Sequence, residues 1–203
     1  MAGPAHLRFA GRPAAEQRAA LEAIVRASPL LMAVLEGARD LAFPDTLLVA
    51  GAVYNTVWNA LTGRPALHGL ADVDLFYFDP QDLSYAAEDR AIQAAASRFA
   101  GLPVPVQLRN QARVHLWFPQ HFAIDYPPLA SSAEGVDRFS TRAHAIGLKL
   151  AADGSLLMHA PFGLEDLFAF RLAPNRRLDN GPTHRSKAAR ALGNWPELSF
   201  EDW

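Results

Sequence analysis

The chain has no cysteine and no long apolar run, and each absence excludes a class of protein. Without cysteine there is no disulfide, no thiolate zinc site and no cysteine nucleophile. No window approaches the roughly 18 apolar residues of a membrane span, and Met1 to Gly11 lacks the apolar run of a signal peptide. We therefore expect a cytoplasmic protein with no membrane partner.

Charge is also scarce. Charged residues make up 20% of the 203, and the formal net charge is -2. Such a chain has no basic field to hold a long nucleic acid, so a polynucleotide partner is disfavoured. Half of the residues are hydrophobic, which is enough to form a core in a chain of this length. The composition predicts a single globular domain over residues 1–203.

Strand and helix patterns alternate along the chain. The expected strands are 46–50, 72–78, 104–110 and, around the turn signal Asp153-Gly154, 145–151 and 155–159. The expected helices are 13–27, 28–40, 52–62, 84–100 (ended by Gly101), 131–139, 163–172 and 184–192, while 111–118 fits either state. This order predicts an α/β (α+β) mixed sheet flanked by helices. Residues 1–45 would be N-terminal helices, 46–160 the core and 161–203 a C-terminal helical extension.

A pair of acids opens the strand expected at 72–78. Alternate strand residues point to the same face, so Asp72 and Asp74 project together. Two like charges side by side are costly without a cation between them, and Mg²⁺ prefers such oxygen ligands together with substrate phosphates. An isolated pair of this kind is more often a solvated edge. Here the apolar run at 75–78 places the pair at the mouth of a buried strand, where ligands bind in open α/β sheets.

Gly51 separates the strand at 46–50 from the next helix. Without a side chain there, backbone N–H groups at Gly51 and Ala52 can approach a phosphate, and the helix dipole favours negative charge. We expect the geometry of this turn to require Gly51, including any positive φ. Asn55 lies one turn into the same helix, where it either reaches the site or serves helix packing.

These residues resemble a known superfamily. Val49 to Val53, Asn55 to Trp58 and Asp72 to Asp79 are similar to blocks of the polymerase-beta-type nucleotidyltransferases, and more narrowly of a family of small bacterial nucleotidyltransferase-like proteins. Further blocks of the narrower pattern are 110–117, 160–164, 166–168 and 195–196. The resemblance implies a mixed-sheet nucleotidyltransferase fold in which Asp72 and Asp74 hold Mg²⁺ and a nucleoside triphosphate binds near Gly51.

Two positions depart from the superfamily pattern. Ala52 stands where glycine or serine is usual, so a hydroxyl that could touch phosphate is missing. The superfamily also places a third acid on a neighbouring strand, and the corresponding residue here is Gln107. An amide cannot take a proton near neutral pH. Asp79 and Asp125 are the alternatives, although Asp79 lies a strand length away and Asp125 lies in a loop.

Four further residues are candidate nucleotide contacts. Arg109 and Arg113 flank Asn110 and could clamp phosphates through bidentate bonds, although surface ion pairs explain single arginines as well. His115 could contact a phosphate or a base, or could pack beside Trp117.

Three functions are open at this point. The first is a nucleotidyltransferase that binds a nucleoside triphosphate with Mg²⁺ and modifies an unidentified small-molecule or protein acceptor. The second is a catalytically silent nucleotide-binding or regulatory domain that keeps the fold, which Gln107 favours. The third is an interaction module with an incidental acid pair, which the intact Asp72 and Asp74 disfavour.

Overall fold

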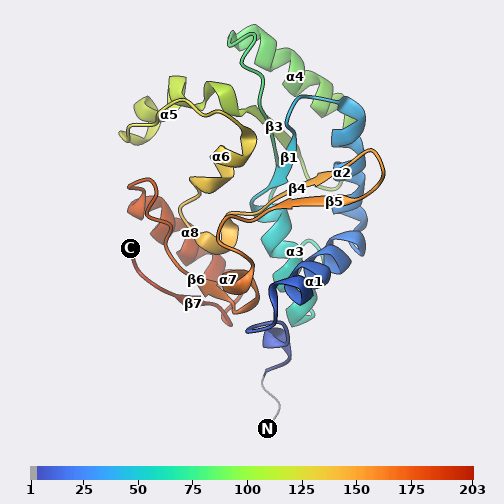
Figure 1. Ribbon diagram of the computed structural model, residues 1–203, viewed down its shortest axis with the longest axis vertical. Coiled ribbons are helices and arrows are strands. Elements are labelled where there is room, and N and C mark those ends of the chain that lie inside the picture. Colours follow the sequence, from blue (N-terminus) through green and yellow to red (C-terminus); the bar gives the residue numbers. More distant parts are fainter. Residues whose placement is uncertain (1–3) are drawn as a thin grey trace.

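Five strands form the central sheet of the computed structural model, which describes residues 4–203 (Figure 1). The strands are β1 (Leu47–Val49), β2 (Val73–Tyr77), β3 (Val106–Asn110), β4 (Gly147–Leu150) and β5 (Leu156–His159). Their order is β3-β2-β1-β4-β5, and β2 and β3 are parallel whereas the other neighbours are antiparallel. The mixed sheet expected from the sequence is confirmed.

Helices lie on both sides of this sheet (Figure 1). They are α1 (Ala14–Arg26), α2 (Pro29–Leu41), α3 (Gly51–Thr62), α4 (Tyr85–Arg98), α5 (Val114–Phe122), α6 (Ser132–Asp137), α7 (Glu165–Phe168) and α8 (Gly181–Asn194). The main core joins α2, α3 and α4 to one face of the sheet, whereas α6 packs against β1 on the other face. In Figure 1, α5, α6 and α8 lie together on this second side.

Alternation along β2 decides which residues enter the main core. Val73, Leu75 and Tyr77 are buried there, beside Leu48 of β1 and Leu108 of β3. Burying side chains of this size contributes about 1.5–3 kcal/mol each relative to exposure. The register of the sheet is thereby fixed, because a slip of one residue would turn these apolar side chains to the opposite face.

Capping residues account for the start of several helices. The Ser28 hydroxyl oxygen accepts a hydrogen bond from the Leu31 N–H at 3.3 Å at the start of α2, and Ser131 does the same for Glu134 at 3.1 Å in α6. The expected end of α4 at Gly101 is wrong. The helix stops at Arg98, because Phe99 packs into the core and its carbonyl accepts a turn bond from the Leu102 N–H at 3.0 Å.

Two other segments differ from the expectation. The ambiguous residues 111–118 are helical, as a 3₁₀ turn (Gln111–Arg113) followed by α5. The helix expected at 163–172 is only the single turn α7, which is followed by β6 (Arg171–Leu172). β6 pairs in parallel with β7 (Ser199–Phe200), and strands of two residues are too short to leave a periodic pattern in sequence. Within residues 4–203, no helix is both long and apolar enough to cross a bilayer.

Candidate active site

Three polar side chains of the sheet meet at the start of β2. Asp74 pairs across the sheet with Val49 of β1 on one side and with Gln107 of β3 on the other. Asp72 immediately precedes the strand, and its Oδ2 accepts a hydrogen bond from Gln107 Nε2 at 2.9 Å. The residue beside the acid pair on the neighbouring strand is thus an amide, at the position where the resemblance places a third acid.

The acid pair lies at the amino end of β2. Because β1 runs antiparallel to β2, this edge is also the carboxyl end of β1, from which the chain enters α3. The carboxyl-end rule for ligand sites therefore applies here to β1 rather than to the strand that carries the acids. Burial and the neighbouring Asp72 charge raise the pKa of Asp74, while Lys187, Arg109 and Arg190 oppose that rise.

The first turn of α3 lines the same pocket as the acids. This pocket has a volume of about 130 Å³, and its walls include Gly51, Asp72 and Asp74. The first N–H groups of a helix lack intrahelical partners, and together with the helix dipole they favour an anion at this end. The structure therefore brings Gly51 and the acid pair together in one pocket.

Ala50, and not Gly51, has the positive φ in this turn. Ala50 is the N-cap residue of α3 and has φ 58° and ψ −133°, a conformation that costs a residue with a side chain about 1–3 kcal/mol. Gly51 has no positive φ, and a Cβ there would lie 3.6 Å from Asn55 Nδ2, which is ordinary contact. The expectation that the backbone requires glycine at 51 is wrong.

Asn55, in the wall of this pocket, has a buried hydrogen-bond acceptor without a partner among the described residues. Its Nδ2 donates to the Gly69 carbonyl at 3.1 Å, which fixes the amide, and the residue lines the pocket although it is only 6% exposed. Its Oδ1 is buried and has no partner among the described residues. A buried acceptor without a donor is costly, and this one belongs to a residue in the wall of the pocket.

Helix α8 supplies two cations that the sequence analysis missed. Lys187 and Arg190 line the acid pocket, and neither has an ion-pair partner within 4.0 Å among residues 4–203. Burial lowers the pKa of Lys187, and the charge of Asp74 opposes that shift. Lys187, Arg190 and Asn194 share one face of α8 at helical spacing, and all three line the pocket. In the sequence alone, this helical spacing of polar residues was the feature that could have indicated a shared polar face on the last helix.

Two uncharged aromatic side chains, Tyr54 and His144, lie near the acid pocket. Tyr54 lines the pocket, and burial raises its pKa to about 12. Its ring stacks on His144 with centroids 4.1 Å apart. Burial lowers the pKa of His144 well below its usual value, so the imidazole is neutral at neutral pH. Among the described residues, the cations that line this pocket are therefore those of α8.

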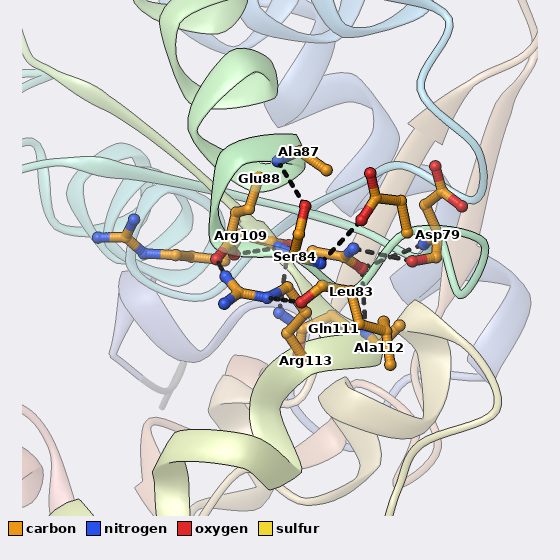
Figure 2. A network of polar contacts seen from close by, with 11 residues as sticks. Asp79, Leu83, Ser84, Ala87, Glu88, Arg109, Gln111, Ala112 and Arg113 are labelled. Atoms are coloured by element: carbon orange, nitrogen blue, oxygen red, sulfur yellow. Dashed lines mark hydrogen bonds and ion pairs between the residues drawn. The ribbon is translucent and has the colours of Figure 1, made fainter.

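Arg113 and Asn110 belong to a separate network at the far end of β3 (Figure 2). Arg113 pairs with Glu88 of α4, and its Nε donates to the Leu83 carbonyl at 2.9 Å. The N–H of Asn110 donates to Glu88 Oε1 at 2.9 Å, and its Oδ1 accepts from the Asp79 N–H at 3.1 Å. Both side chains hold α4 and the β2 end to β3, so neither is free to bind a nucleotide.

Arg109 and His115 have different surroundings. Arg109 is exposed, shares the face of Gln107 and points away from the Glu88–Arg113 pair in Figure 2. It lies close enough to act on the charge of Asp74. His115 lies on α5 and is not among the described residues that line the acid pocket.

Comparison with known proteins agrees with this architecture. A family model described as "Nucleotidyltransferase" matches residues 36–200, which include β1, the acid pair and α8. The chain belongs to this nucleotidyltransferase family. A solved structure described as an NMR structure that "reveals a CCA-adding enzyme head domain" is 26% identical, with a TM-score of 0.74 over 92% of this chain and 96% of that one. No curated protein matches. Family and fold support nucleotidyl transfer as the general function.

Among residues 4–203 of this nucleotidyltransferase, no third acid lines the pocket that holds the pair. Neither Asp79, at the far end of β2, nor Asp125, in the loop after α5, is among the described residues that line the acid pocket. Within residues 4–203, no three His, Asp or Glu side chains gather in an arrangement that could hold a metal ion. The polar atoms at the centre of the site are thus two carboxylates and the Gln107 amide.

Proposed function

We propose that the chain binds a nucleoside triphosphate with Mg²⁺ and transfers its nucleotidyl group to the hydroxyl of an acceptor. One observation carries this proposal. The acid pair, the first turn of α3 and the two cations of α8 all line a single pocket. Carboxylates suit a metal ion, whereas helix N–H groups, a lysine and an arginine suit phosphates, and a triphosphate–metal complex needs both.

The two aspartates fit a divalent cation by their chemistry. Burial and the charge of Asp72 raise the pKa of Asp74, so a second negative charge beside Asp72 is disfavoured unless a cation offsets it. Asp72 and Asp74 would hold Mg²⁺, with the Gln107 carbonyl oxygen as a further neutral ligand. When bound, Mg²⁺ supplies positive charge that offsets the charge of the phosphate oxygens.

The protein's own groups would bind and orient the triphosphate. The backbone N–H of Gly51 would donate to the terminal phosphates, whereas Ala52 is buried and is not among the described residues that line the pocket. Lys187 and Arg190 would offset the charge of the phosphates. The acceptor oxygen attacks the α-phosphorus as the bond to pyrophosphate breaks, and pyrophosphate leaves with the electron pair. The hydroxyl proton passes to water, because the Gln107 amide cannot accept it.

A second candidate function is a silent nucleotide-binding domain. The observation that favours it is the hydrogen bond from Gln107 to Asp72, which places an amide where a general base would be needed. Both candidates require triphosphate binding, and only the first releases pyrophosphate.

Thermal unfolding in the presence of ATP, GTP, CTP or UTP, each with and without Mg²⁺, tests binding. A ligand that binds only the native state raises the melting temperature, by an amount that grows with its concentration over Kd. We expect a rise that needs Mg²⁺ and is lost in Asp72→Asn. The matched control is Asp79→Asn, which alters a carboxylate at the other end of β2 and should keep the rise. An equal melting-temperature rise in the two variants would contradict the proposed site. If the triphosphate binds as expected, a measurement of pyrophosphate release separates an enzyme from a silent binder.

A further inference from the structure

A second pocket adjoins the acid site on the β3 side. Its volume is about 260 Å³, and Lys187 lines both pockets. Phe76 lies two residues beyond Asp74 on the same face of β2, and Arg109 lies two residues beyond Gln107 on β3. The two pockets are therefore neighbours along one face of the sheet.

Aromatic rings form the outer wall of this second pocket. Phe118 of α5 packs against Phe122 and Tyr126, with ring centroids 4.5 Å and 4.4 Å apart, and Trp117 lies 5.7 Å from Phe118. Trp117 is nevertheless 43% exposed and Phe122 41% exposed. Large aromatic side chains left open beside a pocket are typical of ligand sites, where a planar ring can stack on them.

The charged side chains of this pocket indicate which kind of ligand it favours. Arg138 is neutralised by Glu134, with Nη2 and Oε1 2.7 Å apart. Arg109 and Lys187, by contrast, have no ion-pair partner within 4.0 Å among the described residues. The exposed Arg109 beside an aromatic wall suits a flat molecule with an anionic group, and Lys187 lies where the two pockets meet.

The direction of the reaction indicates which substrate this pocket holds. One row across the sheet runs from Val49, next to the first turn of α3, through Asp74 to Gln107. The leaving pyrophosphate belongs at the α3 end of this row, where the helix N–H groups lie. In-line displacement requires the acceptor oxygen to approach from the opposite side, which is the β3 side.

We infer that the second pocket binds the acceptor, a small planar aromatic compound that carries an anionic group. The inference rests on the proposed function for its direction of attack. It does not rest on it for the binding chemistry, because the rings of α5 and Arg109 line this pocket and not the acid pocket. An experiment can therefore contradict ligand binding in the second pocket without contradicting triphosphate binding in the acid pocket, and the reverse.

Isothermal titration calorimetry with two matched probes tests the pocket. The probes are 2-naphthoate and its uncharged counterpart 2-naphthamide. We expect the naphthoate to bind about tenfold more tightly, because a hydrogen bond between two charged groups is stronger than one to a neutral amide. Arg109→Ala should remove this preference, and Trp117→Ala should weaken both probes about fivefold through loss of stacking.

Matched controls alter an arginine and an exposed aromatic residue away from the pocket. Arg90→Ala and Tyr85→Ala replace an exposed arginine and an exposed tyrosine of α4, and both should bind the two probes as the parent does. Equal binding of the two probes by the parent would overturn the inference. So would pocket variants that bind like the controls.

Titration of 2-naphthoate into protein saturated with a magnesium triphosphate separates the two proposals. Unchanged naphthoate affinity is expected, because acceptor and triphosphate occupy adjacent pockets. Competition between them would assign the pocket to the nucleobase and overturn the acceptor inference. A parent that binds naphthoate through Trp117 and Arg109 but shows no Mg²⁺-dependent triphosphate binding would retain the pocket's binding chemistry. It would contradict the proposed function and, with it, the acceptor role.

Discussion

Gln107 Nε2 donates a hydrogen bond to Asp72 Oδ2 across 2.9 Å, so an amide occupies the place beside the acid pair on the neighbouring strand. Its neighbour across the sheet is Asp74, whose pKa burial has already raised. A third carboxylate at this position would add charge to a site that already holds two. Gln107 therefore bears on both metal affinity and the fate of the acceptor proton.

The first prediction concerns Gln107→Glu and Gln107→Asp. Either change supplies a proton acceptor beside the pair, so pyrophosphate release with Mg²⁺ should rise by about 10² to 10⁴-fold. The melting temperature of the metal-free protein should fall because the acids repel one another, and added Mg²⁺ should restore it. A parent as fast as its acid variants would show that another residue takes the proton.

The second prediction is a pH dependence at Asp74. Its folded pKa is raised above its usual value, so the folded state binds the proton more tightly than the unfolded state does. The contribution of Asp74 to stability should therefore decrease as pH rises from the usual value of 3.8 through the raised pKa. Asp74→Asn lacks this decrease and should be the more stable protein at pH 7 without metal. Urea unfolding at pH 3.5, 5 and 7 measures the difference, which should vanish at the lowest pH.

The third prediction separates Ala50 from its neighbours. Ala50→Gly should stabilise the fold by about 1 kcal/mol, because glycine adopts φ 58° without steric cost. Ala52→Gly is the matched control in the first turn of the same helix, and there the change should destabilise by about 1 kcal/mol. Urea unfolding of both variants provides the comparison. A loss of stability in Ala50→Gly would show that this turn carries no strain.

The fourth prediction concerns the Glu88–Arg113 pair. Both side chains are mostly buried, so removing one partner leaves an unpaired charge and should cost about 3 kcal/mol or more in unfolding free energy. The exposed pair Glu22–Arg26 of α1 is the control, and its loss should cost no more than about 0.5 kcal/mol. Triphosphate affinity of the folded Arg113→Ala protein should equal that of the parent. A lower triphosphate affinity in a fully folded Arg113→Ala variant would show that Arg113 contributes to nucleotide binding.

The mixed sheet and the acid pair could be predicted from local pattern. Asp72 and Asp74 share a face because strands alternate, and the apolar residues after them signal a buried strand. Long-range contacts could not be read in this way. Arg113 looked like a phosphate ligand until its pairing with Glu88 was known, since the two meet only through the packing of α4 on β3.

The cations of α8 illustrate the same limit. Lys187 and Arg190 lie far from the acids in sequence, and nothing in the chain's local pattern states which face of α8 turns toward β2. Ala50 shows a different limit, because neither composition nor propensity predicts that alanine adopts a backbone conformation suited to glycine.

The position of α8 also orders events during synthesis of the chain. β1, β2 and β3 leave the ribosome well before Lys187 and Arg190, so the acids and the first turn of α3 can be in place while the helix that balances their charge is still untranslated. Trp195, which follows α8, stabilises the packing of this helix on α3, because its indole N–H donates a hydrogen bond to Asn59 Oδ1 at 3.0 Å. A nascent chain stalled before α8 would therefore carry the two carboxylates without Lys187 and Arg190, and the pocket proposed for the triphosphate would be complete only with α8.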